Sequence, residues 1–216
     1  MTFSQTNIDH LFPTPFVTAA LAPEVSAEIN SQLTEIVLKK LEESKELSVS
    51  TSGCWRSDDR LLEWGGEPVQ TIVASLKELL TQITFCMHDM HFRPANIDWR
   101  IKAWADVHRK RYSNVMQMHP GSYWTAIYYA VAEEEDPKNP KGGDIELLDP
   151  RGVMPLLYCP WLRFGIKGYI TAGMSEIRAP KAGQYFIFPS WLTYSLRPYI
   201  GDSTHISMTF NFSVPE

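Results

Sequence analysis

The chain has 216 residues, of which 44% are hydrophobic and 12% aromatic, enough to bury one sizeable core. This composition excludes an intrinsically disordered or fibrous chain. The 20 Lys and Arg residues against 25 Asp and Glu residues give a net charge of −5, which argues against nonspecific binding to a nucleic-acid backbone.

The cysteines and the N-terminus indicate a cellular compartment. Cys54, Cys86 and Cys159 are far apart and form no C-x-x-C pair, so neither a disulfide framework nor a cysteine zinc site is predicted. The first ten residues lack the basic and apolar regions of a secretory signal, and no apolar stretch is long enough to span a bilayer. We therefore expect a soluble, cytoplasmic protein with no nucleic-acid or membrane partner.

Two amphipathic helices are predicted in the first part of the chain. Apolar side chains recur at three- and four-residue spacing over residues 23–41, behind a favoured first-turn proline. A second stripe runs over residues 69–90, and Arg93-Pro94 is expected to end it. Both helices are expected to pack on a core. The loop of residues 51–60 between them is polar and turn-rich, and its Trp55 is expected to be packed.

The pattern changes to strands from residue 97 onwards. Apolar and polar residues alternate to about residue 108, which predicts a half-buried strand. Helices followed by short strands indicate an α+β fold, with residues 1–95 mainly helical and residues 96–216 forming a barrel or sandwich within one domain. Further short strands, separated by Gly, Pro and Asp turns, are predicted at residues 124–131, 144–148, 162–170, 184–188, 192–196 and 204–212.

The residues alone specify no chemistry. None of the six histidines stands in an H-x-D, H-x-E or H-E-x-x-H spacing, and the chain has no phosphate-binding glycine loop and no G-x-S-x-G elbow.

Three segments nevertheless resemble a bacterial and phage family of 2-oxoglutarate/Fe(II)-dependent oxygenases. The first is Asn114-Val-Met-Gln-Met-His-Pro with its continuation to Tyr129, and the second contains Asp149-Pro-Arg151. The third joins Phe188-Pro-Ser-Trp-Leu-Thr-Tyr194 to His205-Ile-Ser-Met-Thr-Phe-Asn. The family has N-x-x-H-x-H-P, S-G-V-Y-Y, D-P-R, F-P-S-W-L-x-H and R-I-S-I-S-F-N in this order. The resemblance extends over nearly the whole chain.

This resemblance implies a double-stranded β-helix, or jelly-roll barrel, with the N-terminal helices on one face. It also implies Fe(II) and 2-oxoglutarate as cofactors, bound inside the mouth of the barrel. In such enzymes two histidines and one carboxylate, or a close variant, hold the iron, and an arginine on a late strand grips the distal carboxylate of 2-oxoglutarate.

When the family pattern is placed on this sequence, three of four key positions differ from it. The metal positions are Gln117, His119 and Tyr194, and the cosubstrate arginine is replaced by His205. One imidazole, one amide and one phenol predict a weak ferrous site. Tyr129 and Thr209 stand where related barrels hydrogen-bond the cosubstrate. Residues expected to border the substrate pocket are Asn114, Arg151 and Trp191.

The sequence therefore leaves two functions open. The chain is either an oxygenase that hydroxylates a C–H bond of an unknown small molecule or peptide, or a catalytically silent relative whose barrel binds a small anionic or amphipathic ligand. A rearranged metal set, with His119 and a carboxylate from Asp144 or Glu146, and His108 and His205 as other candidates, is a further alternative. Hydrolytic or isomerase chemistry on another metal is the least favoured.

Overall fold

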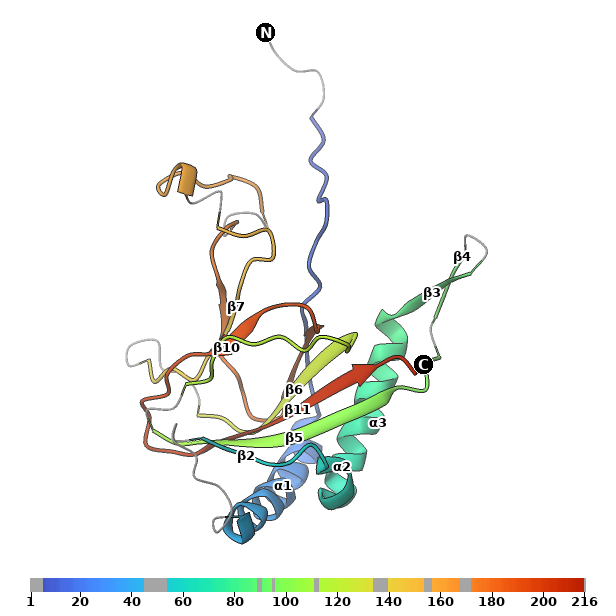
Figure 1. Cartoon of the computed structure of the whole chain (residues 1–216), viewed down its shortest axis with the longest axis vertical. Coiled ribbons are helices and arrows are strands. Elements are labelled where there is room, and N and C mark those ends of the chain that lie inside the picture. Colours follow the sequence, from blue (N-terminus) through green and yellow to red (C-terminus); the bar gives the residue numbers. More distant parts are fainter. Residues whose placement is uncertain are drawn as a thin grey trace.

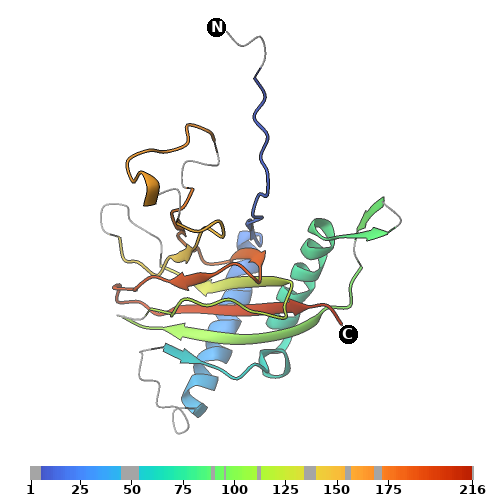
Figure 2. The same ribbon diagram turned by 45° about the horizontal axis from the view of Figure 1, so that its top comes forward.

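Over the described residues, the computed structural model contains two β-sheets that face each other and a separate two-stranded sheet, and helices cover the outer face of the largest sheet (Figures 1 and 2). An extended N-terminal segment projects away from this body (Figure 1). Among the described helices, none is long and apolar enough to cross a membrane. The structure describes residues 6–44, 54–88, 91–94, 96–110, 113–133, 140–153, 157–167 and 172–215.

The helices are α1 (Pro23–Ser44), α2 (Leu61–Trp64) and α3 (Gly66–Ile83). The first agrees with its predicted stripe, whereas α3 begins earlier than expected and stops at Ile83 instead of continuing to about Met90. Thr84 takes an extended backbone, and the chain forms a hairpin of β3 (Phe85–His88) and β4 (His91–Pro94). The predicted continuation was wrong because the apolar side chains of Phe85 and Met87 are exposed on the hairpin and do not face the core.

The larger sheet has six strands in the order β1-β9-β6-β11-β5-β2, all antiparallel. The long strand β11 lies between β5 and β6, so its backbone is hydrogen-bonded on both sides. The strands are β1 (Val17–Ala20), β2 (Cys54–Arg56), β5 (Arg100–His108), β6 (Trp124–Val131), β9 (Gln184–Pro189) and β11 (His205–Ser213).

The smaller sheet has the order β10-β7-β8, with β7 (Ile145–Leu147), β8 (Glu176–Arg178) and β10 (Tyr194–Leu196). The strand predicted at residues 162–170 is not formed over 162–167, and its remainder lies outside the described residues. The loop expected at residues 51–60 also contains a strand, β2, which pairs with the edge of β5. Its Trp55 is packed, as predicted, and its indole N–H donates to the Ser44 hydroxyl at 2.7 Å.

The alternation of side chains along the larger sheet produces two separate apolar clusters. The outer face of the sheet packs on the helices, and the fully buried Leu33 and Leu76 of the helices belong to the same apolar cluster as Met208 and Phe210 of β11. The inner face contacts the smaller sheet through a second cluster. This inner cluster consists of Ile127, Tyr129, Ile145, Leu147, Phe186, Phe188, Leu192, Tyr194 and Leu196.

Two leucines of α1 test whether the helix is held by the outer cluster. Leu33 is fully buried, whereas Leu38 on the same helix is 37% exposed. We expect Leu33→Ala to lower the free energy of unfolding by about 2–5 kcal/mol, because it leaves a cavity against the sheet. Leu38→Ala, the matched control, should cost less than about 1 kcal/mol. Urea denaturation followed by circular dichroism measures both. Equal losses would contradict the assigned packing of α1.

Candidate functional site

The segment before β6 brings two predicted metal positions beside a third. Gln117 forms an isolated antiparallel bridge with Tyr194 on β10, in which each backbone N–H donates to the other carbonyl at 2.8 and 2.9 Å. The backbone N–H of His119 donates to the Ser190 carbonyl at 2.9 Å. Gln117, His119 and Tyr194 are therefore held next to one another by backbone pairing at the inner edge of the smaller sheet.

The side chains of His119 and Tyr194 form a direct hydrogen bond. The His119 Nε2 atom lies 2.9 Å from the Tyr194 hydroxyl, and the two ring centroids are 5.8 Å apart. Trp104 of β5 also contacts the imidazole, with its ring centroid 5.4 Å from that of His119. The imidazole thus packs against two aromatic rings, and one of its nitrogens bonds to the phenol.

Both partners of this hydrogen bond are neutral at pH 7. Burial raises the pKa of the Tyr194 phenol well above its ordinary value, and the charge of Asp106 raises it further. Burial also lowers the pKa of His119 to about 4, and the positive charge of Arg56 acts in the same direction. A neutral imidazole next to a neutral phenol is the stable state of this pair.

The residue at the cosubstrate-arginine position has different partners. His205 begins β11 and is buried; its Nε2 atom accepts a hydrogen bond from the backbone N–H of Glu133 at 3.1 Å. Its ring centroid lies 4.2 Å from that of Tyr199. Burial lowers the pKa of His205 below its ordinary value, so this position has no positive charge at pH 7. None of its described contacts is with Gln117, His119 or Tyr194.

The two predicted cosubstrate contacts lie on the inner face of the larger sheet. Thr209 is buried on β11 and pairs with Trp104 on one side and Ile127 on the other. Tyr129 is also buried, and its hydroxyl has no hydrogen-bond partner among the described residues. An unsatisfied buried hydroxyl is costly, which marks this point as a place for a polar atom of a guest molecule or a water.

The predicted pocket residues lie outside this inner face. Asn114 is half-buried, and its backbone N–H donates to the Leu196 carbonyl at 3.2 Å, whereas Trp191 is 54% exposed. Arg151 forms a two-pronged ion pair with Asp149, and Asp149 also accepts the backbone N–H groups of Arg151 and Gly173. The Asp149-Pro-Arg151 segment is therefore a turn closed by an ion pair.

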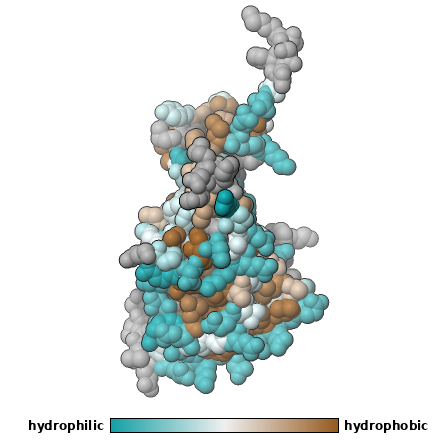
Figure 3. Space-filling view, turned by 90° about the vertical axis from the view of Figure 1, so that its right-hand side faces the viewer, coloured by the Kyte–Doolittle hydropathy of each residue, from teal (hydrophilic) through white to brown (hydrophobic). Residues whose placement is uncertain are grey.

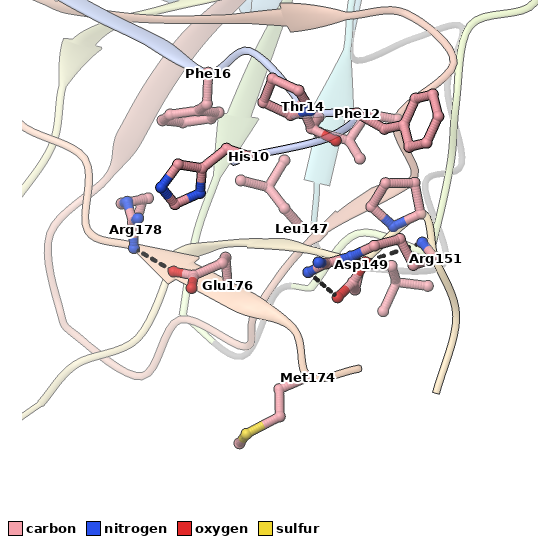
Figure 4. A pocket seen from close by; sticks show the side chains of 14 residues that line it. His10, Phe12, Thr14, Phe16, Leu147, Asp149, Arg151, Met174, Glu176 and Arg178 are labelled. Carbon is pink, nitrogen blue, oxygen red and sulfur yellow. Dashed lines mark hydrogen bonds and ion pairs between the residues drawn. The ribbon is translucent and has the colours of Figure 1, made fainter. Parts of the chain in front are cut away.

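A cavity of about 510 Å³ lies between this turn, β8 and the N-terminal segment (Figure 4). Phe16, Leu147 and Leu192 form apolar parts of its wall, and Phe16 also packs on the inner cluster. Two ion pairs, Asp149–Arg151 and Glu176–Arg178, contribute charged groups to the lining. The cavity combines apolar and charged walls, a combination suited to an amphipathic ligand.

Sequence reasoning missed an ion pair beside His119 whose carboxylate is buried and whose guanidinium is partly exposed. The guanidinium of Arg56 donates to both carboxylate oxygens of Asp106 at 2.7 and 3.3 Å, and the Trp104 indole N–H donates to the same carboxylate at 3.0 Å. Asp106 is on the polar face of the strand predicted from residue 97, and that face was expected to be exposed, whereas residues 103–108 are buried on both faces. The alternation therefore gave no signal for this pair, and neither did Arg56, which lies in a segment expected to be a loop.

The rearranged metal set is not assembled by the described residues, among which no group of three or more His, Cys, Asp or Glu side chains is placed to hold a metal ion. Glu146 accepts a hydrogen bond from Ser175 at 2.5 Å and lies 3.9 Å from Arg197. The printed partners of the Glu146 carboxylate are thus Ser175 and Arg197, and His119 is not among them.

Comparisons with known proteins agree with this architecture. Residues 102–211 match the family described as "Putative 2OG-Fe(II) oxygenase". Among curated proteins, none matches the chain.

Several solved structures are similar over most of their length. A prolyl-4-hydroxylase from Pseudomonas putida has 11% identity and a TM-score of 0.56, with 94% of each chain covered. A Trichoplax adhaerens prolyl hydroxylase, solved with a fragment of hypoxia inducible factor, has 12% identity and a TM-score of 0.59, covering 92% of this chain and 83% of that one. A viral collagen prolyl hydroxylase from Paramecium bursaria Chlorella virus-1 has 12% identity and a TM-score of 0.56, and the match covers 93% of this chain and 96% of that one. These likenesses establish a shared fold.

The depressed pKa of His119 gives a prediction for acid stability. The pKa of His119 is about 4 in the folded chain, against about 6.5 for a histidine exposed to water, so the unfolded chain binds more protons between these values. The contribution of His119 to stability is therefore complete above about pH 6.5 and is lost as the pH falls to about 4. We expect the His119 ring signals in an NMR titration to have a midpoint near 4. His119→Gln should make the acid decline in unfolding free energy less steep. A midpoint near 6.5 would contradict this environment.

Proposed function

The chain belongs to the 2OG-Fe(II) oxygenase family, and on that premise we propose that it is a catalytically silent member that binds a small anionic or amphipathic ligand. We also infer that its strands form a double-stranded β-helix. The chain passes repeatedly between the two facing sheets. Its order is β5 (larger sheet), Gln117 (bridged to the smaller sheet), β6 (larger), β7 and β8 (smaller), β9 (larger), β10 (smaller) and β11 (larger). Such alternation between two facing sheets is the connectivity of a jelly roll.

The iron that the family implies does not fit the residues at its expected position. Fe(II) is well held by neutral imidazoles and carboxylates, whereas a carbonyl oxygen such as that of Gln117 suits harder cations. Tyr194 would bind a metal only as a phenolate, and its burial disfavours that form. The Nε2 atom of His119 is already engaged by the same phenol. The donor set therefore offers one imidazole and no carboxylate.

The 2-oxoglutarate site is only partly preserved. The unpartnered Tyr129 hydroxyl and the buried Thr209 are still suited to a carboxylate oxygen. The cation is missing, because His205 is neutral at pH 7 and its Nε2 atom accepts the Glu133 N–H. A hydrogen bond to a charged group contributes about 1.5–3 kcal/mol, so loss of an arginine fork corresponds to about ten- to a hundredfold weaker binding.

One observation carries the proposal: the 2.9 Å hydrogen bond between His119 and Tyr194. Two side chains at iron-ligand positions satisfy each other, and breaking their bond to bind a metal would leave a buried phenol without a partner. In such a pocket the hydrogen-bonded His119 and Tyr194 side chains occupy the positions where the family pattern has metal ligands. The cavity of about 510 Å³ between the Asp149–Arg151 turn, β8 and the N-terminal segment, which none of the predicted metal residues line, supports binding of a ligand as the retained activity.

The competing function is an active oxygenase. It is favoured by the family match over residues 102–211 and by the polar position that the Tyr129 hydroxyl marks in the interior. The two functions differ in one measurable property, which is whether the protein as it stands binds Fe(II) and consumes 2-oxoglutarate.

The purified protein tests the proposal directly. We expect isothermal titration under anaerobic conditions to give no stoichiometric Fe(II) binding at micromolar protein. We also expect an aerobic assay with Fe(II) and 2-oxoglutarate to form no succinate above a protein-free control. Stoichiometric iron together with multiple turnovers to succinate would overturn the proposal and establish the oxygenase.

Restoring the family residues tests the assigned positions. We expect Gln117→His, Tyr194→His and His205→Arg together to raise Fe(II) affinity by at least about tenfold for each imidazole added, since each supplies a good ferrous ligand. The control variant carries Gln70→His and Tyr158→His, which add two imidazoles at exposed positions outside the site. Thermal unfolding confirms that both variants are folded. Equal iron affinity in the triple variant and the control would show that the correspondence of positions is wrong.

A further inference from the structure

A projecting loop between β7 and β8 exposes several large apolar side chains close together. The structure describes its residues 157–167, which stand out from the body at the same end of the molecule as the N-terminal segment (Figures 1 and 2). Soluble proteins rarely expose such a dense apolar group unless it contacts a partner. We call the five residues the apolar tip: Leu157 (69% exposed), Tyr158 (81%), Trp161 (79%), Leu162 (58%) and Phe164 (52%).

Hydrogen bonds within the loop hold its shape. The backbone N–H of Leu162 donates to the Cys159 carbonyl at 3.2 Å. The Arg163 guanidinium donates to the carbonyls of Pro160 and Leu162, both at 2.7 Å. Carbonyls that already accept a hydrogen bond cost less to bring into an apolar medium. The backbone of the tip is therefore suited to a partner with few hydrogen-bonding groups of its own.

The charges around the tip are positive. From residue 151 to residue 175 the sequence has no Asp or Glu, although the whole chain has 25 such residues. Of the three cations in this stretch, Arg151 pairs with Asp149. Arg163 and Lys167 are exposed, and neither forms an ion pair with a residue that the structure describes. The bonds of Arg163 to carbonyls leave its charge unneutralised, so the loop is locally cationic in a chain with a net charge of −5.

The loop stands over the larger cavity. The Asp149–Arg151 turn just before the loop and Met174 just after it both line the cavity of about 510 Å³, whose walls are partly apolar and partly charged. In the space-filling view, apolar and hydrophilic surface lie close together in the upper lobe of the molecule, at the height of this loop (Figure 3). A surface that supplies amphipathic molecules would thus meet the protein at the cavity.

The residue types and the shape of the tip favour a lipid surface over a protein. Tryptophan and tyrosine, which have an apolar body and a polar edge, are enriched where water meets lipid. Exposed arginine and lysine attract anionic lipid head groups. A convex tip enters a fluid bilayer directly, whereas a protein partner would have to supply a closely matching concave surface.

We propose that the apolar tip binds the surface of a bilayer that contains anionic phospholipids. Trp161 and Leu162 insert among the lipid head groups, and Arg163 and Lys167 lie beside the negative charges of those head groups. Insertion of so few side chains gives reversible binding. The sequence predicted no membrane partner because no segment is long enough to span a bilayer, but binding at the surface requires no such segment. The inference goes beyond the proposed function and does not depend on it.

Flotation of the full chain with lipid vesicles tests the proposal. We expect the protein to float with vesicles of phosphatidylcholine mixed with phosphatidylserine. Vesicles of phosphatidylcholine alone should bind it about tenfold more weakly, because they offer no net negative charge to Arg163 and Lys167.

Two double variants remove the same amount of exposed apolar surface from different places. We expect Trp161→Ser with Leu162→Ser to weaken binding to the mixed vesicles at least about tenfold, because both side chains leave water on binding. Phe85→Ser with Met87→Ser is the matched control, because both side chains are exposed on the β3–β4 hairpin, away from the tip. The control should float like the wild type.

A second pair of variants changes charge alone. Lys167→Glu should weaken binding to the mixed vesicles severalfold and leave binding to phosphatidylcholine unchanged. Lys77→Glu is the control, because it makes the same change in net charge at an exposed position of α3. It should bind both kinds of vesicle like the wild type.

Brominated phospholipids give a measurement that does not depend on the double variant being folded. They quench the fluorescence of tryptophans that enter the bilayer, and we expect the conservative variant Trp161→Phe to lose most of the quenching seen in the wild type. Quenching that is unchanged in Trp161→Phe would show that the tip does not insert.

Three other results would overturn the proposal. They are no flotation of the wild type, equal flotation of the tip and hairpin variants, and equal binding to both kinds of vesicle. A wild type that is dimeric by light scattering, becomes monomeric when Trp161 and Leu162 are replaced and does not float would assign the tip to a second copy of the chain instead. Iron binding and succinate formation bear only on the proposed function, so the two proposals can fail separately.

Discussion

The fold depends on the pairing of β11 with strands on both of its sides. Its backbone is bonded to β5 along one edge and to β6 along the other, so the orientation of every side chain is set by the register. One set faces the helices and is entirely apolar: Ile206, Met208, Phe210 and Phe212. The other set faces inward and is polar: His205, Ser207, Thr209 and Asn211. A shift of one residue would bury the polar set against α1 and α3, which the hydrophobic effect opposes.

This constraint places polar groups inside the molecule, where each one needs a partner. Most of them find one without a ligand. The Thr125 hydroxyl lies 2.9 Å from that of Ser190 and donates to Asn211 at 2.8 Å, and His119 bonds to Tyr194. The Tyr129 hydroxyl has no hydrogen-bond partner among the described residues. The proposal that the site is catalytically silent rests on this internal pairing, because side chains that already bond to one another gain little from a metal.

Much of the fold follows from local sequence pattern, and much of the site does not. The stripe over residues 23–41 and the alternation from residue 97 are local periodicities, and both elements form. The strands β1, β2, β3, β4 and β8 were missed because their pairing partners, not their own composition, make them strands. The ion pair of Arg56 with Asp106 joins residues 50 positions apart, and the bond of His119 to Tyr194 joins residues 75 apart. No local pattern specifies such contacts. Family resemblance pointed to the second pair and was silent about the first.

The charges beside His119 bear on the proposed loss of iron. A ferrous site needs ligands whose charge balances a divalent cation, and a carboxylate commonly supplies it. The Asp106 carboxylate accepts two hydrogen bonds from the Arg56 guanidinium and one from the Trp104 indole, so it is already committed to other partners. The same guanidinium helps to keep His119 neutral. The Arg56–Asp106 pair is neutral as a whole, so it adds no net negative charge that would hold a cation at Gln117, His119 and Tyr194.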